Sequence, residues 1–269
     1  MPLFLSLSSG SNGNCYYLGE KDSGIIIDIG IGVRCIKKRL LSAGIGLDSI
    51  KAVLISHDHF DHIRSLGTYT EKRKTPVYTT REVINSFERH YCTKGYMSGC
   101  CRPLEAGIPN TIELPCKDGN KEIELVPFRV PHDATDTVGF HITLDGTKIT
   151  FITDIGDITE DAVRYAADSD HLIIEANYDV DMLIRGSYPP DLKLRIMQGF
   201  GHLSNEQTAC LLERVTSNAG CHLRKVFLCH LSENNNTPET AYRTIKKAIP
   251  EGIALYCLPR REASELFEL

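Results

Sequence analysis

The residues with the clearest capacity for chemistry lie in one short segment, Ser56-His57-Asp58-His59-Phe60-Asp61-His62. Imidazole nitrogens and carboxylate oxygens are the ligands that zinc, iron and manganese take in proteins. The segment directly follows an apolar run at residues 51–56, which is typical of a strand buried on both faces. Histidines two positions apart in a tight loop can converge on one ion, so the segment predicts a metal site at a strand end.

The order His-x-His-x-Asp-His after an apolar strand resembles the metallo-β-lactamase superfamily. In that family the first two histidines bind one metal ion and the following Asp-His pair binds a second. The resemblance therefore implies that His57 and His59 belong to a first metal site, and that Asp61 and His62 belong to a second.

The same resemblance implies three further ligands at later strand ends, and the chain has candidates in the expected order. His132 follows Val-Pro-Phe-Arg-Val-Pro and would complete the first site, whereas Asp154 follows an apolar run and would bridge both ions. His230 follows the apolar run at residues 226–229 and would complete the second site. Asp28 matches the aspartate with which the family orients a ligand histidine.

Two divalent cations a few ångströms apart would lower the pKa of a bridging water, so that a metal-bridging hydroxide is available at neutral pH. They would also clamp the oxygens of a phosphoryl displacement, and would equally serve thioester or amide hydrolysis. We expect Asp61 to orient or deprotonate the attacking water. His202 lies beside an expected helix N-terminus, with Ser204 or Asn205 as its N-cap, and is the candidate proton donor to the leaving oxygen. Zn²⁺, Mn²⁺ and Fe²⁺ all suit these ligands, so the metal stays open.

Five further motifs resemble the YycJ/WalJ branch of bacterial metallo-hydrolases, and the resemblance covers nearly the whole chain. They occupy residues 8–15, 131–133, 175–179, 201–205 and 230–239, of which the last two are the most specific. That branch is a group of 5′ to 3′ DNA exonucleases connected with mismatch repair. The resemblance places substrate binding on Asn177, Tyr178, Ser204 and Asn205. It has one departure, because the branch more often has histidine where Tyr178 stands, and tyrosine can replace its hydrogen bond but not its metal affinity.

The elements that must position these residues form two successive blocks, each of strands followed by strand–helix units. Strands are expected at residues 3–8, 14–20, 24–28, 51–56, 122–130, 138–144, 148–154, 171–176 and 226–230. Helices are expected at residues 33–43, 63–73, 81–91, 159–168, 180–200 and 206–219, and from residue 237. Residues 92–115 are rich in Gly, Pro and Cys and remain unassigned. The pattern predicts an α/β fold, an αββα four-layer sandwich, as a single domain over residues 1–269, and the resemblance implies that this sandwich is of the metallo-β-lactamase type.

Composition sets limits on compartment and partners. The 269 residues are 42% hydrophobic and include ten cysteines without a Cys-x-x-Cys pair, which favours reduced thiols in the cytoplasm over a disulfide framework. Neither a signal peptide nor a membrane-spanning run is indicated. The net charge of −5 does not by itself point to nucleic acid. Two divalent ions would bring it to about −1, so a nucleic acid would have to bind locally, with the basic cluster at residues 72–74 as the preferred contact.

These observations favour a dinuclear phosphodiesterase acting on nucleic acid, with DNA preferred to RNA. An RNA-processing nuclease of the same fold is the nearest alternative, and a small-molecule thioester or lactone hydrolase is the competing enzyme class. The ten cysteines disfavour a secreted β-lactamase. The complete ligand set disfavours a non-catalytic metal-binding module, and the oligomeric state stays open.

Overall fold

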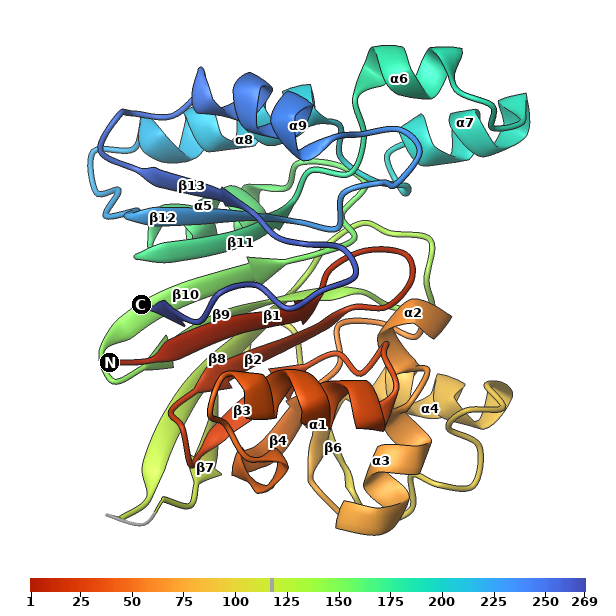
Figure 1. Cartoon of the computed structure of the whole chain (residues 1–269), viewed down its shortest axis with the longest axis vertical. Coiled ribbons are helices and arrows are strands. Elements are labelled where there is room, and N and C mark those ends of the chain that lie inside the picture. The colour runs from red at the N-terminus through yellow and green to blue at the C-terminus, as the bar shows by residue number, and fades with distance from the viewer. Residues whose placement is uncertain (117–118) are drawn as a thin grey trace.

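The computed structural model describes residues 1–116 and 119–269, in which two seven-stranded sheets pack face to face (Figure 1). The first sheet has the order β14-β1-β2-β3-β4-β5-β6 and the second the order β13-β12-β11-β10-β9-β8-β7. The strands of the first sheet are β1 (Leu3–Ser8), β2 (Cys15–Gly19), β3 (Gly24–Ile27), β4 (Ile50–Leu54), β5 (Val77–Thr80), β6 (Cys101–Leu104) and β14 (Phe267–Glu268). Those of the second are β7 (Asn110–Leu114), β8 (Lys121–Arg129), β9 (Val138–Leu144), β10 (Thr147–Ile152), β11 (His171–Glu175), β12 (Lys225–Cys229) and β13 (Ala254–Cys257).

Helices cover the outer face of each sheet and complete four layers. The helices on the outer face of the first sheet are α1 (Val33–Ser42), α2 (Phe60–Ile63), α3 (Leu66–Arg73), α4 (Arg81–Ser86) and the short 3-10 helices η1 (Leu47–Ser49) and η2 (Phe87–Arg89). The second carries α5 (Glu160–Ala167), α8 (Asn205–Thr216) and α9 (Pro238–Lys246), whereas α6 (Val180–Arg185) and α7 (Pro190–Met197) project beyond its end. The predicted αββα sandwich is confirmed.

The strands are buried on both faces because each sheet separates two apolar cores. In β2, Tyr16 and Leu18 point into the core between the sheets, and Cys15 and Tyr17 into the core beneath the helices of the first sheet. A third core lies between the second sheet and its helices. Since successive strand residues face opposite sides, this arrangement requires nearly continuous apolar runs such as the one at residues 51–56.

The parallel strands of the two sheets end at one common side of the molecule, and this topology positions the site. In the first sheet β3, β4, β5 and β6 run parallel, and in the second β10, β11, β12 and β13 do. Ligand sites of α/β sheets lie beyond the carboxyl ends of such strands. The polar residues at these ends are Asp28 after β3, the histidine-rich loop after β4, Asp154 after β10, Glu175 at the end of β11 and His230 after β12.

Local element boundaries differ from the sequence prediction in several places. The helix expected at residues 180–200 is two helices, α6 and α7, because Pro189 and Pro190 interrupt it and Pro190 starts the second one. The helix expected at residues 63–73 begins only at Leu66, after the single turn of α2. The unassigned residues 92–115 contain β6 and β7. Among the described residues, no helix combines the length and the apolar character that crossing a membrane requires.

His171, at the start of β11, makes the stability of the fold depend on pH. It is buried, and neither ring nitrogen has a hydrogen-bond partner among the described residues. Burial, reinforced by Lys225 and Arg224, lowers its pKa to about 4. The unfolded chain binds a proton on this residue below its ordinary pKa of about 6.5, so stability is lost as the pH falls from about 6.5 toward 4.

We therefore expect His171→Leu to reduce the pH dependence of stability. Between pH 7 and pH 4 the free energy of unfolding of the parent protein should fall by up to about 3 kcal/mol more than that of the variant. Urea unfolding of both proteins across this range measures the difference. Two parallel curves of unfolding free energy against pH would contradict the prediction.

Candidate metal centre

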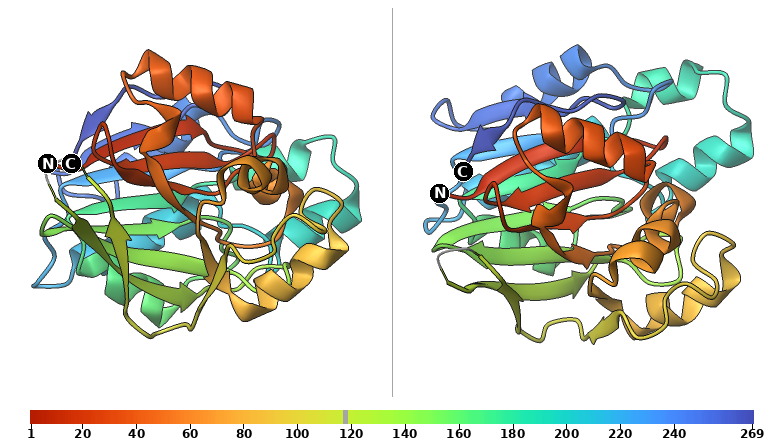
Figure 2. Two further views of the ribbon diagram at one scale, coloured as in Figure 1. Left: turned by 90° about the horizontal axis from the view of Figure 1, so that it is seen from below. Right: turned by 60° about the horizontal axis from the view of Figure 1, so that its bottom comes forward.

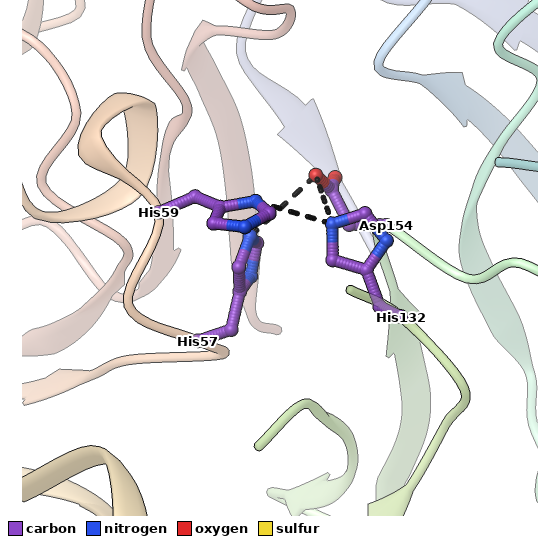
Figure 3. Close-up of side chains that lie close together, drawn as sticks. All are labelled: His57, His59, His132 and Asp154. Carbon is purple, nitrogen blue, oxygen red and sulfur yellow. Dashed lines mark hydrogen bonds and ion pairs between the residues drawn. The ribbon is translucent and has the colours of Figure 1, made fainter. Parts of the chain in front are cut away.

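Four of the predicted ligands converge where the loop after β4 meets the second sheet (Figure 3). Ligand atoms of His57, His59, His132 and Asp154 all lie within 4.8 Å of one another. His132 Nε2 lies 3.2 Å from His59 Nδ1, and His57 Nε2 lies 3.6 Å from Asp154 Oδ2. Three imidazoles and a carboxylate gathered in this way form a donor set suited to one divalent cation.

A second group of ligand atoms adjoins the first through Asp154. Asp61, His62 and His230 also place their ligand atoms within 4.8 Å of one another. Asp154 Oδ2 lies 3.4 Å from His62 Nε2, and Asp154 Oδ1 lies 3.3 Å from His230 Nδ1. The Asp154 carboxylate thus faces both groups, and the structure brings together all seven residues predicted as ligands.

The protonation chemistry of the two groups fits cation binding. Nε2 of His57 and of His230 is buried without a hydrogen-bond partner among the described residues, as expected of a nitrogen placed to ligate. Burial, together with His62, holds the pKa of His57 well below its ordinary value, which leaves its nitrogen free to bind a metal. Burial opposes charge on Asp154, but the neighbouring His230 and His62 outweigh it and keep the Asp154 pKa well below normal.

Around His230 the carboxylates generate a negative potential. Burial opposes protonation of this histidine, yet Asp154 and Asp61 raise its pKa to about 10. A divalent cation placed among the same carboxylates would take over the role of that proton, so metal binding is coupled to proton release.

Asp28 fixes the orientation of His62. Its Oδ2 lies 2.7 Å from His62 Nδ1, and its Oδ1 accepts a 2.9 Å hydrogen bond from the backbone N–H of Ser56. With Nδ1 held in this way, His62 Nε2 is turned toward Asp154. This is the contact that the resemblance predicted for Asp28, and it sets the tautomer that a ligand histidine needs.

Three of the site residues adopt left-handed backbone conformations directly beyond strand ends. Asp28, Asp154 and His230 have φ values of 60°, 50° and 52°. This region costs a non-glycine residue about 1–2 kcal/mol, so the surrounding structure must hold it. In each case the sharp turn follows a buried strand and directs the side chain toward the metal ligands.

The Ser/Gly-rich loop between β1 and β2 supports the ligands from the first sheet. Asn14 donates its backbone N–H to Asp61 O at 2.8 Å and its side-chain amide to Asp61 Oδ2 at 3.2 Å. Ser9 Oγ accepts a 2.9 Å hydrogen bond from the backbone N–H of His230. The motif at residues 8–15 marks this loop in the sequence, but the contact of Asn14 with Asp61 is visible only in the structure.

Gly30 allows the close approach of this support to the metal loop. A Cβ on Gly30 would lie 1.6 Å from the backbone oxygen of Asp61. We expect Gly30→Ala to lower the free energy of unfolding by about 2–4 kcal/mol and to reduce metal content, because Asp61 must shift. Urea unfolding and metal analysis of the purified proteins measure both effects.

Gly32→Ala is the matched control for this variant. A Cβ at Gly32 meets nothing within 4 Å, and the backbone φ of −59° suits alanine. Its unfolding free energy should stay within about 0.5 kcal/mol of the parent. Equal behaviour of the two alanine variants would contradict the role given to Gly30.

A buried carboxylate–imidazole pair, Glu175 with His202, lies beside the ligands, and of the two only His202 was predicted to take part in the chemistry. Glu175 is fully buried; its Oε1 accepts hydrogen bonds of 2.9 Å from the backbone N–H groups of Ile155 and Leu203. Its Oε2 lies 3.1 Å from Nδ1 of His202, whose side chain is 21% exposed. Burial opposes charge on His202, but Glu175 outweighs it and raises the His202 pKa. The signal for Glu175 was its place at the end of the apolar run at residues 171–174.

The pair adjoins the second ligand group. Ligand atoms of Asp154, Glu175, His202 and His230 also lie within 4.8 Å of one another. His202 is therefore close enough either to exchange a proton with a bound substrate or to contact an ion, and metal analysis of a variant separates the two.

A cavity of about 320 Å³ opens onto these groups. Its lining includes His59, His132, Asp154, His202 and His230, and on the side of α7 it includes Tyr188, Leu192 and Arg195. The Arg195 guanidinium pairs with Asp133, which also lines the cavity and lies 3.5 Å from His132 Nε2. The cavity thus holds the candidate cation site, and the charge of Arg195 at its edge is paired with Asp133.

The four residues predicted to bind substrate divide into two kinds. Asn177 lines the cavity and donates its amide to His230 O at 2.9 Å. Tyr178, Ser204 and Asn205 are buried and lie outside the cavity lining. Ser204 caps α8 by accepting from Gln207 N, Tyr178 forms a backbone bridge with Ser204, and Asn205 donates to Asn236 Oδ1 at 3.0 Å.

The basic cluster at residues 72–74 lies at the wrong end of the sheet for the contact predicted for it. Arg73 pairs with Asp48 at 2.6 Å, in a surface hollow that also includes Ile50 at the start of β4. The metal loop follows the other end of β4, about 16 Å away for a five-residue strand. Helix α3 extends away from the site, so the basic residues in its last turn lie far from the ligands.

Two converging sets of histidine and carboxylate ligands, at the strand ends of an αββα sandwich, define a metal-dependent hydrolase of the metallo-β-lactamase fold. The chain belongs to the β-lactamase superfamily, in its YycJ/WalJ-like branch. The model of the β-lactamase superfamily domain matches residues 24–230.

Curated relatives resemble the chain over most of its length. The exodeoxyribonuclease YycJ of Bacillus anthracis is 28% identical over 252 residues, which cover 92% of this chain and 89% of that protein. The exodeoxyribonuclease WalJ of Streptococcus pneumoniae is 30% identical over 239 residues, which cover 89% of this chain and 85% of that protein.

Solved structures support the fold. The metallo-β-lactamase fold protein YhfI from Bacillus subtilis superposes with a TM-score of 0.69 at 15% identity, and covers 100% of both chains. Zn²⁺-bound PqqB from Methylobacterium extorquens superposes with a TM-score of 0.70 at 16% identity, over 99% of this chain and 100% of that chain.

Proposed function

We propose that this protein is a dinuclear metal-dependent phosphodiesterase that degrades DNA from the 5′ end toward the 3′ end. The observation that carries the proposal is the Asp154 carboxylate, which faces two groups of ligands at 3.3 to 3.6 Å. The substrate class is supported by the relatives YycJ and WalJ, which are named exodeoxyribonucleases and are aligned over 89% and 85% of their lengths.

Different residues of the site have different roles in the proposed phosphodiester hydrolysis. Two bound divalent cations, Zn²⁺, Mn²⁺ or Fe²⁺, would supply an activated water and neutralise the phosphate oxygens. Asp61 lines the cavity and has its pKa held well below normal despite burial, chiefly by His62, so it can accept a hydrogen bond from the attacking water. His202 donates a proton to the leaving oxygen, and Glu175 holds its ring in position.

The proposal extends to the setting of the reaction. All ten cysteines are free thiols, which supports a reducing cytoplasm. Residues 1–269 would act as one domain, since strands β1 and β14 from the two ends of the chain pair in the same sheet. A role in DNA repair follows from the same resemblance to the YycJ/WalJ branch.

Digestion of end-labelled nucleic acids tests the function. The metal-loaded protein should release labelled mononucleotides early from 5′-labelled DNA, whereas 3′-labelled DNA should shorten progressively. Parallel reactions contain single-stranded and double-stranded DNA, RNA of the same sequence, a thioester and a lactone. Early release of the 3′ label would reverse the direction, and preferential cleavage of RNA would favour an RNA-processing nuclease. Hydrolysis of the thioester or a lactone without cleavage of nucleic acid would overturn the proposal.

A further inference from the structure

A cluster of exposed planar side chains, formed by Phe60, Arg64 and Tyr91, lies at the edge of the metal centre. Tyr91 is 77% exposed and Phe60 is 39% exposed. Their ring centroids are 5.6 Å apart with an interplanar angle of 35°. The Arg64 guanidinium lies over the Phe60 ring, 4.8 Å from its centroid. The three side chains, here called the planar cluster, thus support one another at the surface.

The planar cluster is tied directly to the cavity. Phe60 stands between His59 and Asp61, and both of these neighbours line the cavity. Consecutive Cα atoms are about 3.8 Å apart, so the backbone of Phe60 directly adjoins two residues of the cavity, and its ring is 39% exposed. In Figure 2 the α2–α4 region in orange and yellow and the α6–α7 region in blue-green project on the same side of the molecule. The planar cluster belongs to the first of these two regions.

Buried Asp58 fixes Tyr91 relative to the metal loop. Asp58 Oδ2 lies 3.2 Å from Nε2 of His90, the residue that precedes Tyr91. Asp58 Oδ1 also accepts a 3.1 Å hydrogen bond from the backbone N–H of Thr135. The Asp58 carboxylate therefore connects the metal loop to the segments that contain His90 and Thr135, and these contacts hold the backbone next to Tyr91 in place.

Charge beside the planar cluster suits a phosphate backbone. Arg64 and Arg89 are exposed, and Arg89 donates to Thr135 Oγ1 at 2.9 Å. In the part of the chain that the structure describes, neither arginine forms an ion pair with a carboxylate, whereas Arg73, Arg195 and Arg261 do. In a chain with a net charge of −5, these two guanidinium groups without a carboxylate partner place positive charge beside the planar cluster.

We infer that the planar cluster binds single-stranded DNA beside the scissile phosphodiester, with a base stacked on Tyr91 and with Arg64 and Arg89 at the adjacent phosphates. The inference rests on the proposed function and specifies the form of its substrate. Stacking on an aromatic ring tolerates every base, as an exonuclease requires, and it needs an unpaired base whose faces are open. The planar cluster therefore favours single-stranded ends over fully paired ones.

The test compares Tyr91→Ala with the parent enzyme, both loaded with metal. For a single-stranded 12-nucleotide DNA we expect KM to rise about 10-fold in Tyr91→Ala, with kcat changed less than twofold. Tyr91→Trp should restore KM because its larger ring stacks at least as well. Hydrolysis of bis(p-nitrophenyl) phosphate, which is too small to reach the planar cluster, should be unchanged. Tyr242→Ala, which removes a 43% exposed tyrosine on α9, is the matched control.

The outcomes separate the inference from the proposed function. An unchanged KM for DNA in Tyr91→Ala, with DNA still degraded by both proteins, would overturn the inference and leave the proposed function standing. An equal rise of KM in Tyr242→Ala would also overturn it. A parent enzyme that hydrolyses bis(p-nitrophenyl) phosphate but does not degrade DNA would overturn the proposed function itself. A rise of KM for RNA alone would overturn the assignment of DNA as the bound strand.

Discussion

Asp154→Asn is expected to remove both metal ions and to lower the rate of phosphodiester hydrolysis by about 1000-fold or more. The Asp154 carboxylate lies 3.6 Å from His57 Nε2, 3.4 Å from His62 Nε2 and 3.3 Å from His230 Nδ1, so it faces both ligand groups. Asparagine keeps the size of the side chain but removes its negative charge and one anionic oxygen. Metal analysis of the purified protein and kcat measured at saturating substrate test the two parts of the prediction.

Variants of residues that belong to one ligand group only show whether Asp154 differs from them in serving both metal sites. His59→Ala and His230→Ala each remove a residue of one group, so each should lower the metal content by about one ion per chain. Asp157→Asn is the matched control, since Asp157 is exposed and accepts a hydrogen bond from Ile158 N. It should keep both ions and full activity. An Asp154→Asn protein that retains one ion at the parent affinity would show that Asp154 serves a single site.

The ligands were predictable from sequence because their signal is local or topological. His57, His59, Asp61 and His62 lie in one loop, and a loop keeps its residues together whatever the rest of the chain does. Asp154 and His230 each follow an apolar strand, and parallel strands of the same sheet end on one side. The order of the apolar strands, and of the polar residues that follow them, is therefore enough to predict most of the metal ligands.

Residues whose role depends on tertiary neighbours were not predictable in the same way. Asn14 reaches Asp61 across 47 positions of sequence, and Glu175 meets His202 only because the segment before α8 crosses the end of β11. The basic cluster at residues 72–74 was misplaced because distance along the sequence does not give the direction of a helix. The start of α8 was predictable, because Ser204 is a preferred N-cap residue and does cap this helix, whereas its assignment to substrate binding came only from the motif of the branch.

The fold was predictable at the level of layers, and less so at the sheet edges. Strands buried on both faces, such as β4 and β12, can be recognised in the sequence as apolar runs. The edge strands β6 and β14 are short and partly exposed, and their pairing with β5 and β1 depends on the rest of the sheet. Such strands have too little pattern of their own to be assigned.

His202→Ala is expected to lower kcat for DNA by about 100- to 10,000-fold while both metal ions are retained. His202 Nδ1 lies 3.1 Å from the buried Glu175, its side chain reaches the cavity, and the neighbouring carboxylate favours the protonated ring. A proton held there can be given to the oxygen that leaves when the phosphodiester bond breaks. Glu175→Gln should show a smaller loss of the same kind, because it removes the charge that stabilises the imidazolium.

The dependence on the leaving group distinguishes proton donation from metal binding. The p-nitrophenolate ion leaves without a proton, whereas the sugar oxygen of DNA needs one, so His202→Ala should slow bis(p-nitrophenyl) phosphate at least 10-fold less than DNA. Metal analysis completes the comparison. Equal loss for both substrates together with the loss of one ion would identify His202 as a ligand, which the group formed by Asp154, Glu175, His202 and His230 allows geometrically. Retained metal with selective loss on DNA would instead assign the proton to His202, with Glu175 as the residue that holds it there.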